Sequence, residues 1–563
     1  MSKQRITYDN NVLGQARFAD YQELANARLL NNSGGVVFGR INNSLVEKPA
    51  EIQGHSLIVG GTGTGKSRGI AIPTLLRWKG AVLAIDVKGE LSKLTAQHRP
   101  NVHIFDPENE GEPYDPLQEC KTIDGAQELA RCLIPEPQTG DPFWAKTAQA
   151  FLAAGAMQGA LEGERFVDVI ERLCITQPEQ LIENLQNSSH RAVRMLSSVG
   201  VGMPEKTMGG VFAELRSKII TLGADPNIEK ATSSGSLTPQ TLEEGSTIYL
   251  KVSEKMLKQY ESLWSVIVSQ ILRYLQSREE RSDPPILILL DEFPRLGRMP
   301  GILDALATLR SRNVHILIFV QSMAQLDHLY SANERKIIAD NCGFKLVLSA
   351  TDPETQKYFS DLSGQQTVWV GNRGYADGRS TAGAIGIIPG ASVNKSQGLS
   401  QQGTPLIRPE EFSKLEYPVL FAPGLYPCYV SKSYWDKDPE LAPTMGMKPE
   451  RPEKMKQSIK PKSKINWRII QVCVSLLAGF VIATFALKYF IGYSISNTSV
   501  KSKMTAVEYE SAIRASKSIL YTVKAVFSTW NNFKTFALIW LGSAWFIFGP
   551  SSVLRAIFGR RKN

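Results

Sequence analysis

The chain has 563 residues, of which 43% are hydrophobic and 21% charged, so it exceeds one ordinary domain and is too apolar for a globally disordered protein. Its formal net charge of +10 is unevenly placed: residues 441–563 hold 19 Lys and Arg against 4 Asp and Glu, a net +15, which leaves −5 for residues 1–440. The basicity therefore indicates a membrane surface near the C-terminal end, and any DNA contact of the body must come from local patches. The six cysteines form no CxxC pair and the histidines show no metal-ligand spacing, which is typical of a reduced, cytoplasmic body without structural zinc.

The first 50 residues are mostly polar, and they predict an N-terminal arm that packs against the body. A turn at residues 31–35 and a short strand candidate at residues 36–38 are their main structural signals. Because the first ten residues hold no apolar run, we expect no signal peptide at this end of the sequence.

An apolar run at residues 56–59 leads into the strongest local motif of the chain. The motif consists of Gly60, Gly61, Thr62, Gly63, Thr64, Gly65, Lys66 and Ser67. Its spacing satisfies the P-loop pattern, in which glycines let backbone N–H groups close around phosphate oxygens at a helix N-terminus. We therefore predict that these residues bind the phosphates of ATP or GTP, with Lys66 reaching the β- and γ-phosphates and Ser67 the Mg²⁺ ion. A chance match without phosphate binding is the alternative, which the preceding apolar strand disfavours.

The remaining strand candidates are mostly apolar, and residues 81–86 form an unbroken apolar run that ends in a carboxylate, the pattern of a parallel strand buried on both faces. The candidates lie at residues 81–86, 102–105, 247–250, 286–290, 314–320 and 345–349. Between the second and third of these runs, residues 118–236 show helical periodicity, which predicts an all-α domain. The alternation of strands and helices predicts an α/β fold with a doubly wound, mostly parallel sheet over residues 51–117 and 237–436.

Two carboxylates, Asp291 and Glu292, end the strand candidate at residues 286–290, a placement that suits ATP hydrolysis. Asp291 would hold the Mg²⁺ shell, and Glu292 would polarise a water toward the γ-phosphate. An acidic pair after a strand can also cap a helix, but the upstream P-loop favours the catalytic interpretation. Gln321 ends the next strand candidate, where it can sense the γ-phosphate or orient water, and a capping or solvent role stays open.

Sites of this kind commonly use an arginine that a neighbouring subunit supplies, because charge develops on the γ-phosphoryl group during transfer. The candidates are Arg295, Arg298, Arg310 and Arg312. We take Arg310 as the catalytic arginine, with a solvated surface charge as the alternative for each of the four.

The C-terminal third begins with a polar segment, residues 364–403, that shows little periodicity and predicts a long loop or partly disordered segment. A hairpin of residues 418–421 with residues 429–431 is expected to close the globular part near residue 436. A basic linker rich in Pro and Lys follows over residues 437–466.

Residues 467–563 predict a membrane hairpin with two apolar helices, at about 469–487 and 537–554. A helix of nineteen residues rises about 28 Å, which matches the hydrocarbon core of a bilayer. Lys and Arg flank both segments, and a buried core helix is the alternative for each. Because a body that binds ATP is cytoplasmic, we expect both termini in the cytoplasm and the loop at residues 488–534 outside, as in a multi-pass membrane protein. The excess of Lys and Arg outside the hairpin agrees weakly with this orientation.

Two longer runs, DVKGEL at residues 86–91 and DEFPRLG at residues 291–297, are more specific than the P-loop. With the P-loop and Gln321-Ser322, they make residues 36–436 resemble the type IV secretion coupling proteins, the TraG/TraD-like ATPases of conjugation. Members of that family usually carry their membrane hairpin at the N-terminus, whereas here it is predicted at the C-terminal end.

The resemblance implies a RecA-like motor that assembles as a homo-hexamer in the bacterial inner membrane, with ATP and Mg²⁺ as cofactors. It further implies that relaxase-bound single-stranded DNA is recruited to the proteins of a type IV secretion channel, and that hydrolysis drives or gates the transfer. DNA would be gripped through its phosphates without sequence reading. Protein effectors as cargo, or a nucleotide-controlled membrane receptor or scaffold with little motor activity, are the alternatives.

Overall fold

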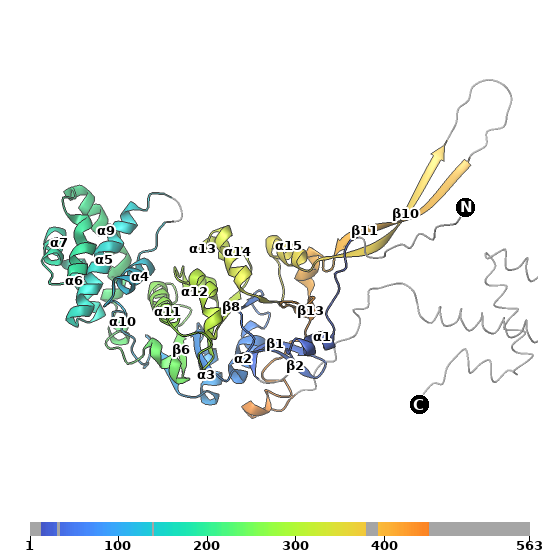
Figure 1. Cartoon of the computed structure of the whole chain (residues 1–563), viewed down its shortest axis with the longest axis horizontal. Coiled ribbons are helices and arrows are strands. Elements are labelled where there is room, and N and C mark those ends of the chain that lie inside the picture. The colour runs from blue at the N-terminus through green and yellow to red at the C-terminus, as the bar shows by residue number, and fades with distance from the viewer. Residues whose placement is uncertain (1–12, 31–33, 138–139, 379–391, 450–563) are drawn as a thin grey trace, which may run out of the picture. The chain divides into compact units, whose positions relative to one another are not determined.

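The computed structural model describes residues 13–30, 34–137, 140–378 and 392–449 (Figure 1). By its internal contacts the chain divides into Met1–Met455 and Lys456–Asn563, and every described residue lies in the first unit. The predicted spans at residues 469–487 and 537–554 therefore lie outside the described residues, as does most of the predicted linker. Among the helices that are described, none is both long and apolar enough to cross a bilayer.

One mixed sheet forms the centre of this unit, with the strand order β13-β12-β9-β3-β8-β7-β4-β6-β5. The strands are β3 (Ser56–Val59), β4 (Ala81–Asp86), β5 (Val102–Phe105), β6 (Thr247–Lys251), β7 (Ile286–Leu290), β8 (Val314–Val320), β9 (Phe344–Val347), β12 (Val419–Phe421) and β13 (Cys428–Tyr429). Neighbours from β9 to β5 pair in parallel, whereas β12 runs antiparallel to both β9 and β13. The predicted mostly parallel sheet and its closing hairpin are confirmed.

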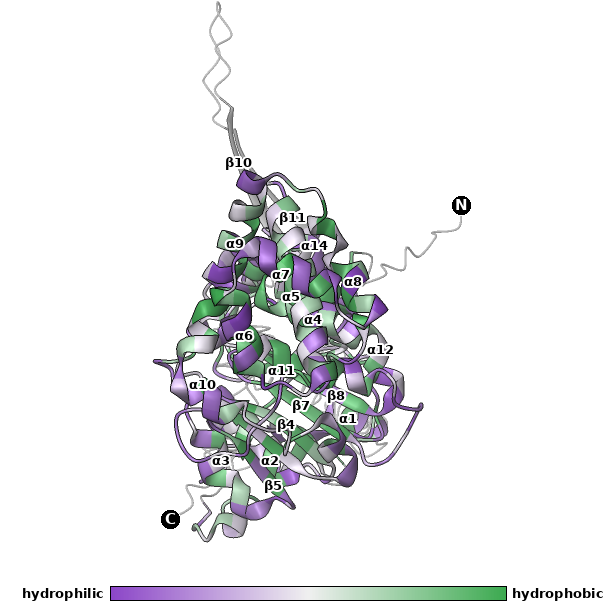
Figure 2. Cartoon of the chain, turned by 90° about the vertical axis from the view of Figure 1, so that its left-hand side faces the viewer, coloured by the Kyte–Doolittle hydropathy of each residue, from purple (hydrophilic) through white to green (hydrophobic). Residues whose placement is uncertain are grey.

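Helices cover both faces of the sheet, which explains why its central strands are apolar without alternation. They are α2 (Ile72–Arg77), α3 (Glu90–Thr95), α11 (Glu261–Leu275), α12 (Ile302–Thr308), α13 (Ala324–Leu329), α14 (Ala332–Asn341) and α15 (Pro353–Leu362). Because successive strand residues face opposite sides, Leu57 packs in one core with α11 and α12, and Ile58 in another with α2. Figure 2 shows hydrophobic residues concentrated on β4 and β7.

The described residues between β5 and β6 that belong to regular elements form helices, as predicted for the all-α domain. These helices are α4 (Ile123–Leu133), α5 (Phe143–Glu162), α6 (Phe166–Ile175), α7 (Pro178–Gln186), α8 (Arg191–Ser197), α9 (Glu205–Ala224) and α10 (Pro226–Ala231). Helix α5 is rich in Ala and Gly and contacts α4, α6, α8 and α9, while α4 also packs on α11 of the sheet domain. The small side chains of α5 let its neighbours approach closely.

Two hairpins lie outside the main sheet. The first joins β1 (Gly35–Ile41) and β2 (Ser44–Pro49) behind α1 (Tyr21–Asn26). The second joins β10 (Gln365–Gly378) and β11 (Ser392–Pro405), which pair antiparallel along their whole length. The expectation of a long loop at residues 364–403 is therefore wrong for the described part of that segment. The base of the β10–β11 hairpin also pairs with the N-terminal arm, through an antiparallel bridge between Gln15 and Gln366.

The folded body extends past residue 436, where we expected it to end. The guanidinium of Arg40 in β1 lies 2.5 Å from Asp438 and 2.5 Å from Glu440, and the Arg40 and Asp438 side chains are almost completely buried. Leu441 and Ala442 are buried as well. The first residues of the segment that we predicted as a linker are thus part of the core.

Candidate nucleotide-binding site

The P-loop leaves the sheet at the end of β3, level with the end of β8. Val59 pairs with Val320, and the N–H of Gly60 donates to the carbonyl of Val320 at 3.1 Å. Gly63 and Gly65 have φ angles of 76° and 95°, a region that side-chain-bearing residues rarely adopt. The loop conformation therefore depends on glycine at these two positions, which is the requirement that the motif encodes.

Lys66 points its ammonium group back into the loop, where its Nζ donates to the carbonyl of Gly60 at 2.6 Å and to that of Gly61 at 3.4 Å. The side chain is only 7% exposed, and this burial lowers its pKa, against the opposing effect of Glu292 and Asp291. Loop carbonyls are weak partners for an ammonium group, so a phosphate oxygen fits this position better. Directly after Lys66, Ser67 opens the helical segment Ser67–Ala71, which continues into α2.

The two predicted carboxylates follow β7, which pairs with β8 on one side and β4 on the other. The Asp291 carboxylate accepts a hydrogen bond from the N–H of Glu292 at 3.1 Å. Burial, reinforced by the Glu292 charge, raises the pKa of Asp291 to about 7, while Lys66 opposes the shift. A buried carboxylate of this kind is a good ligand for Mg²⁺, because the cation offsets the cost of its negative charge.

Glu292 is held in an unusual backbone conformation, with φ 49° and ψ 41°. Left-handed residues other than glycine cluster at functional sites, where the surrounding fold holds them in place. The Nε2 of Gln321 donates to the Glu292 carboxylate at 3.2 Å. The structure thus brings Lys66, Asp291, Glu292 and Gln321 to one edge of the sheet, beside the loop.

Arg310, the arginine that we predicted to act in catalysis, lies at the other edge of the sheet. It lines a cavity of about 370 Å³ together with Gly54 and Phe344. Gly54 precedes β3 and Phe344 is the first residue of β9, so both lie at the ends of these strands opposite the P-loop. The side chain of Arg310 is exposed, and among the described residues it makes no hydrogen bond or ion pair. Within one chain Arg310 is therefore not part of the P-loop site.

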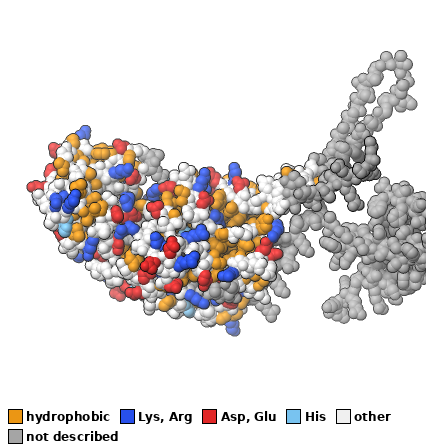
Figure 3. All heavy atoms as spheres, in the orientation of Figure 1, with side chains coloured by type: hydrophobic (Ala, Val, Ile, Leu, Met, Phe, Trp, Pro, Cys, Tyr) orange, Lys and Arg blue, Asp and Glu red, His pale blue; other side chains and the backbone are white. Residues whose placement is uncertain are grey.

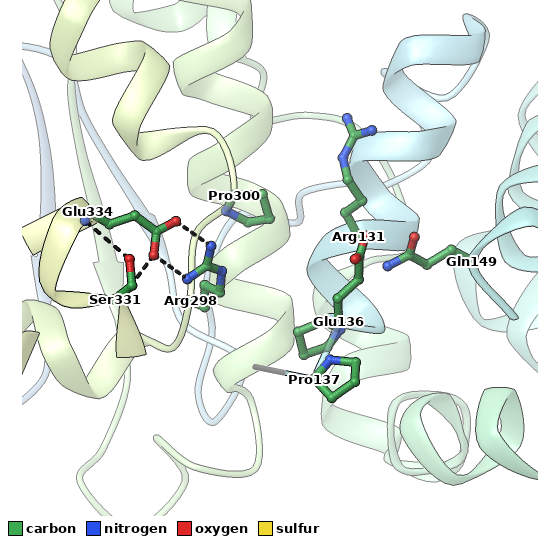
Figure 4. A pocket seen from close by; sticks show the side chains of 9 residues that line it. Arg131, Glu136, Pro137, Gln149, Arg298, Pro300, Ser331 and Glu334 are labelled. Atoms are coloured by element: carbon green, nitrogen blue, oxygen red, sulfur yellow. Dashed lines mark hydrogen bonds and ion pairs between the residues drawn. The ribbon is translucent and has the colours of Figure 1, made fainter. Parts of the chain in front are cut away.

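The other three arginines have partners within the same chain. Arg295 lies 3.2 Å from Glu254. The guanidinium groups of Arg312 and Arg278 each donate a hydrogen bond to the backbone carbonyl of the other residue. Arg298 pairs with Glu334 at 2.7 Å in a separate cavity of about 510 Å³ (Figure 4). That cavity is lined by Arg131, Pro135, Glu136, Pro137, Gln149, Arg298, Pro300, Ser331 and Glu334.

Sequence reasoning missed residues that other strands bring to the loop. Lys88, in the DVKGEL run, lies near enough to Lys66 to lower its pKa, and its Nζ is 3.7 Å from Glu254. Asp86 of the same run caps α3, because its carboxylate accepts from the N–H groups of Leu91 and Ser92. The run itself is visible in the sequence, but nothing local in it shows that Asp86 caps a helix while Lys88 lies near the P-loop lysine.

The sequence matches the family model described as type IV secretory system conjugative DNA transfer over residues 10–468. The protein VirD4 of Rhizobium rhizogenes is 28% identical over 433 residues, which cover 72% of this chain and 62% of that protein. The conjugal transfer protein TraG of Rhizobium radiobacter is 24% identical over 425 residues, which cover 71% of this chain and 64% of that protein. The chain thus spans about three fifths of the length of these curated relatives.

The fold is similar to that of the bacterial conjugative coupling protein TrwB, with a TM-score of 0.59 and 19% identity over 74% of this chain and 92% of that chain. TrwB has also been solved in complex with ADP and Mg²⁺, and that structure gives a TM-score of 0.59 with 18% identity over 74% of this chain and 94% of that chain. The likeness confirms the RecA-like α/β fold.

Proposed function

The chain belongs to the type IV secretory system conjugative DNA-transfer family, and on this premise we propose that it is a coupling ATPase for conjugation. It recruits relaxase-bound single-stranded DNA to a type IV secretion channel and uses ATP hydrolysis to drive or gate the transfer. The observation that carries the proposal is the meeting of Lys66, Asp291, Glu292 and Gln321 beside the P-loop.

We assign each residue of the site a role from its place in the motif or after its strand. The eight loop residues cradle the phosphates of ATP, with Lys66 on the β- and γ-phosphates. Ser67 and Asp291 would hold Mg²⁺, which would supply positive charge for the phosphoryl oxygens. Glu292 polarises the attacking water, and the 3.2 Å hydrogen bond from Gln321 orients its carboxylate.

The assembly is proposed to be a homo-hexamer in the bacterial inner membrane. Residues 467–563 would anchor it through the predicted hairpin, with the ATPase body and both termini on the cytoplasmic side. In such a ring, Arg310 of one subunit would act on the nucleotide of the next, where its exposed guanidinium meets the γ-phosphate. A DNA strand would be held by local Lys and Arg loops rather than by a basic surface. Figure 3 supports this, because acidic and basic side chains are interspersed on the face that it shows.

A mating assay tests the proposal in a donor strain that lacks the gene. We expect wild type to restore plasmid transfer and Lys66→Ala to restore none, because the phosphates lose their principal cation. Lys93→Ala, which removes an exposed lysine from α3, is the matched control and should transfer normally. Normal transfer by Lys66→Ala at equal protein levels would leave only a scaffold role. A truncation after Lys460 that loses transfer but hydrolyses ATP would assign docking to the hairpin.

A further inference from the structure

The side chain of Tyr434, near the C-terminal end of the described residues, lies against the P-loop. A Cβ atom built on Gly65 would stand 2.9 Å from Cε1 of Tyr434, and one on Gly69 would stand 3.6 Å from Cδ1 of the same ring. The guanidinium of Arg68 lies 4.6 Å from the centre of the Tyr434 ring, a cation–π contact. Both side chains keep part of their surface exposed. Tyr434 and Arg68 thus form a flat, partly open pair directly beside the phosphate loop.

The segment that carries Tyr434 is tied down on both sides. Trp435 donates its N–H to the carbonyl of Arg68 at 3.2 Å, and the Nε of Arg68 donates to Asp436 at 2.8 Å. The N–H of Asp438 donates to the carbonyl of Tyr434 at 2.8 Å, and Asp438 itself forms the buried ion pair with Arg40. Because these contacts fix the backbone around the ring, Tyr434 is held in place before any ligand arrives.

The order of the strands shows which end of a nucleotide would face this pair. Strands β8 and β7, which carry Gln321 and Asp291, lie on one side of β3, while β9, β12 and β13 lie on the other. Strand β13 runs in the same direction as β9, so Tyr434 emerges at the same edge as the P-loop but on the flank away from Asp291. A nucleotide whose γ-phosphate meets the carboxylates therefore directs its ribose and base toward the flank of Tyr434.

We propose that Tyr434 and Arg68 form the platform on which the base of the bound nucleotide stacks. This proposal rests on the proposed function and extends it, since it assigns a contact to the base of the nucleotide whose phosphates the P-loop would bind. A tyrosine ring and a planar guanidinium both stack well on the flat face of a purine. Stacking reads the face of a base and not its edge, so the platform accepts adenine and guanine alike.

A comparison of two ligands isolates the platform from the phosphate site. Magnesium ATP carries a base, whereas magnesium tripolyphosphate presents the same phosphate chain without one. With the purified full chain and titration calorimetry, we expect Tyr434→Ala to weaken ATP binding by about tenfold, the loss of one stacking contact, and to leave tripolyphosphate binding unchanged. Tyr434→Phe keeps the ring and should bind ATP as wild type does.

Tyr426 provides a matched control, because its ring also carries an arginine, Arg17, at 4.4 Å from its centre. Tyr426→Ala should change the binding of neither ligand. Equal weakening of ATP and tripolyphosphate by Tyr434→Ala would show that the ring only supports the loop, and unchanged ATP binding would show that it does not touch the base; either result overturns the platform. A wild-type chain that binds neither ligand would instead overturn the proposed function itself.

Discussion

Lys48 is a charged residue in an unusual place, since its side chain in β2 is completely buried. Its Nζ lies 2.7 Å from Nδ1 of His315 and donates to the carbonyl of Ile52 at 2.8 Å. Burial lowers the pKa of Lys48 to about 7, and burial together with Lys48 lowers the pKa of His55 to about 3. The fold therefore favours the neutral form of this lysine near physiological pH.

This burial predicts a pH-dependent stability. An unfolded lysine has a pKa of roughly 10.4, so between about pH 7 and pH 10 the unfolded chain binds more protons than the folded one. The free energy of unfolding should therefore rise with pH across this window, and below it the contribution of Lys48 becomes constant. Lys48→Met should flatten the rise in thermal midpoint, measured on the full chain.

Lys93→Met controls for the loss of an exposed lysine and should keep the wild-type slope. A Lys48→Met slope equal to that of wild type would mean that Lys48 keeps its proton in the native state. The difference between variants matters here, since other groups titrate in the same window and contribute to both slopes.

At this scale, the sequence predicts the residues whose roles depend on short spacing. Lys66 and Ser67 follow from the loop motif, and Asp291 and Glu292 from their place after an apolar strand. Tyr434 could not be predicted, because its contact with Gly65 depends on the path of the chain through the whole sheet. The hydrogen bond between Gln321 and Glu292 depends on neighbouring strands, which the sequence orders only in part.

At the scale of elements, helix α5 shows how small residues set packing. A Cβ on Gly159 would stand 2.2 Å from Cγ2 of Val169, a stiff and fully buried side chain of α6. Gly159→Ala should therefore separate α5 from α6 and destabilise the chain by about 1–3 kcal/mol, measured by denaturant unfolding.

The matched variant is Gly209→Ala in α9, where a Cβ would meet no atom within 4 Å. The same substitution there should stabilise the chain by up to about 1 kcal/mol, because alanine is the better helix former. If both variants shifted stability in the same direction, the close approach of α5 and α6 would not be the cause.

The sheet and the β10–β11 hairpin differ in how well the sequence predicts them. Buried parallel strands need apolar runs, and these runs are plain in β4, β7 and β8. The hairpin is rich in Gly, Gln and Ser, and its strands are held by backbone pairing from Gln365 and Pro405 to Gly378 and Ser392. Pairing of this kind leaves little periodicity in the side chains, so the sequence predicts a loop for this segment.

At the scale of the whole molecule, the position of Arg310 predicts different effects on ATP turnover and on nucleotide affinity. Because Arg310 lies at the opposite edge of the sheet from the P-loop of its own chain, Arg310→Ala should leave nucleotide affinity unchanged. The same substitution should abolish ATP turnover, because in the proposed ring this arginine acts on the γ-phosphate of the neighbouring subunit's nucleotide. The mixture of Arg310→Ala with Glu292→Gln subunits tests action between subunits, measured as ATPase activity.

Neither variant should turn over ATP alone, but a mixed ring contains intact Glu292 sites that face an intact Arg310 from the neighbour, so activity should return. A mixture of Arg310→Ala with the double variant Arg310→Ala/Glu292→Gln offers no such pair and should stay inactive. Unchanged turnover by Arg310→Ala alone would remove this arginine from the mechanism.

The contacts of Arg40 with Asp438 and of Arg68 with Asp436 have a mechanical consequence. The chain beyond residue 449 follows the buried Leu441 and Ala442 and, before them, these two contacts, of which the one with Arg68 lies directly after the P-loop. If the proposed hairpin anchors the chain, tension along it would reach contacts beside the P-loop before it reached the central strands. Pulling force and nucleotide occupancy would then act on the same few contacts, so each could alter the lifetime of the other.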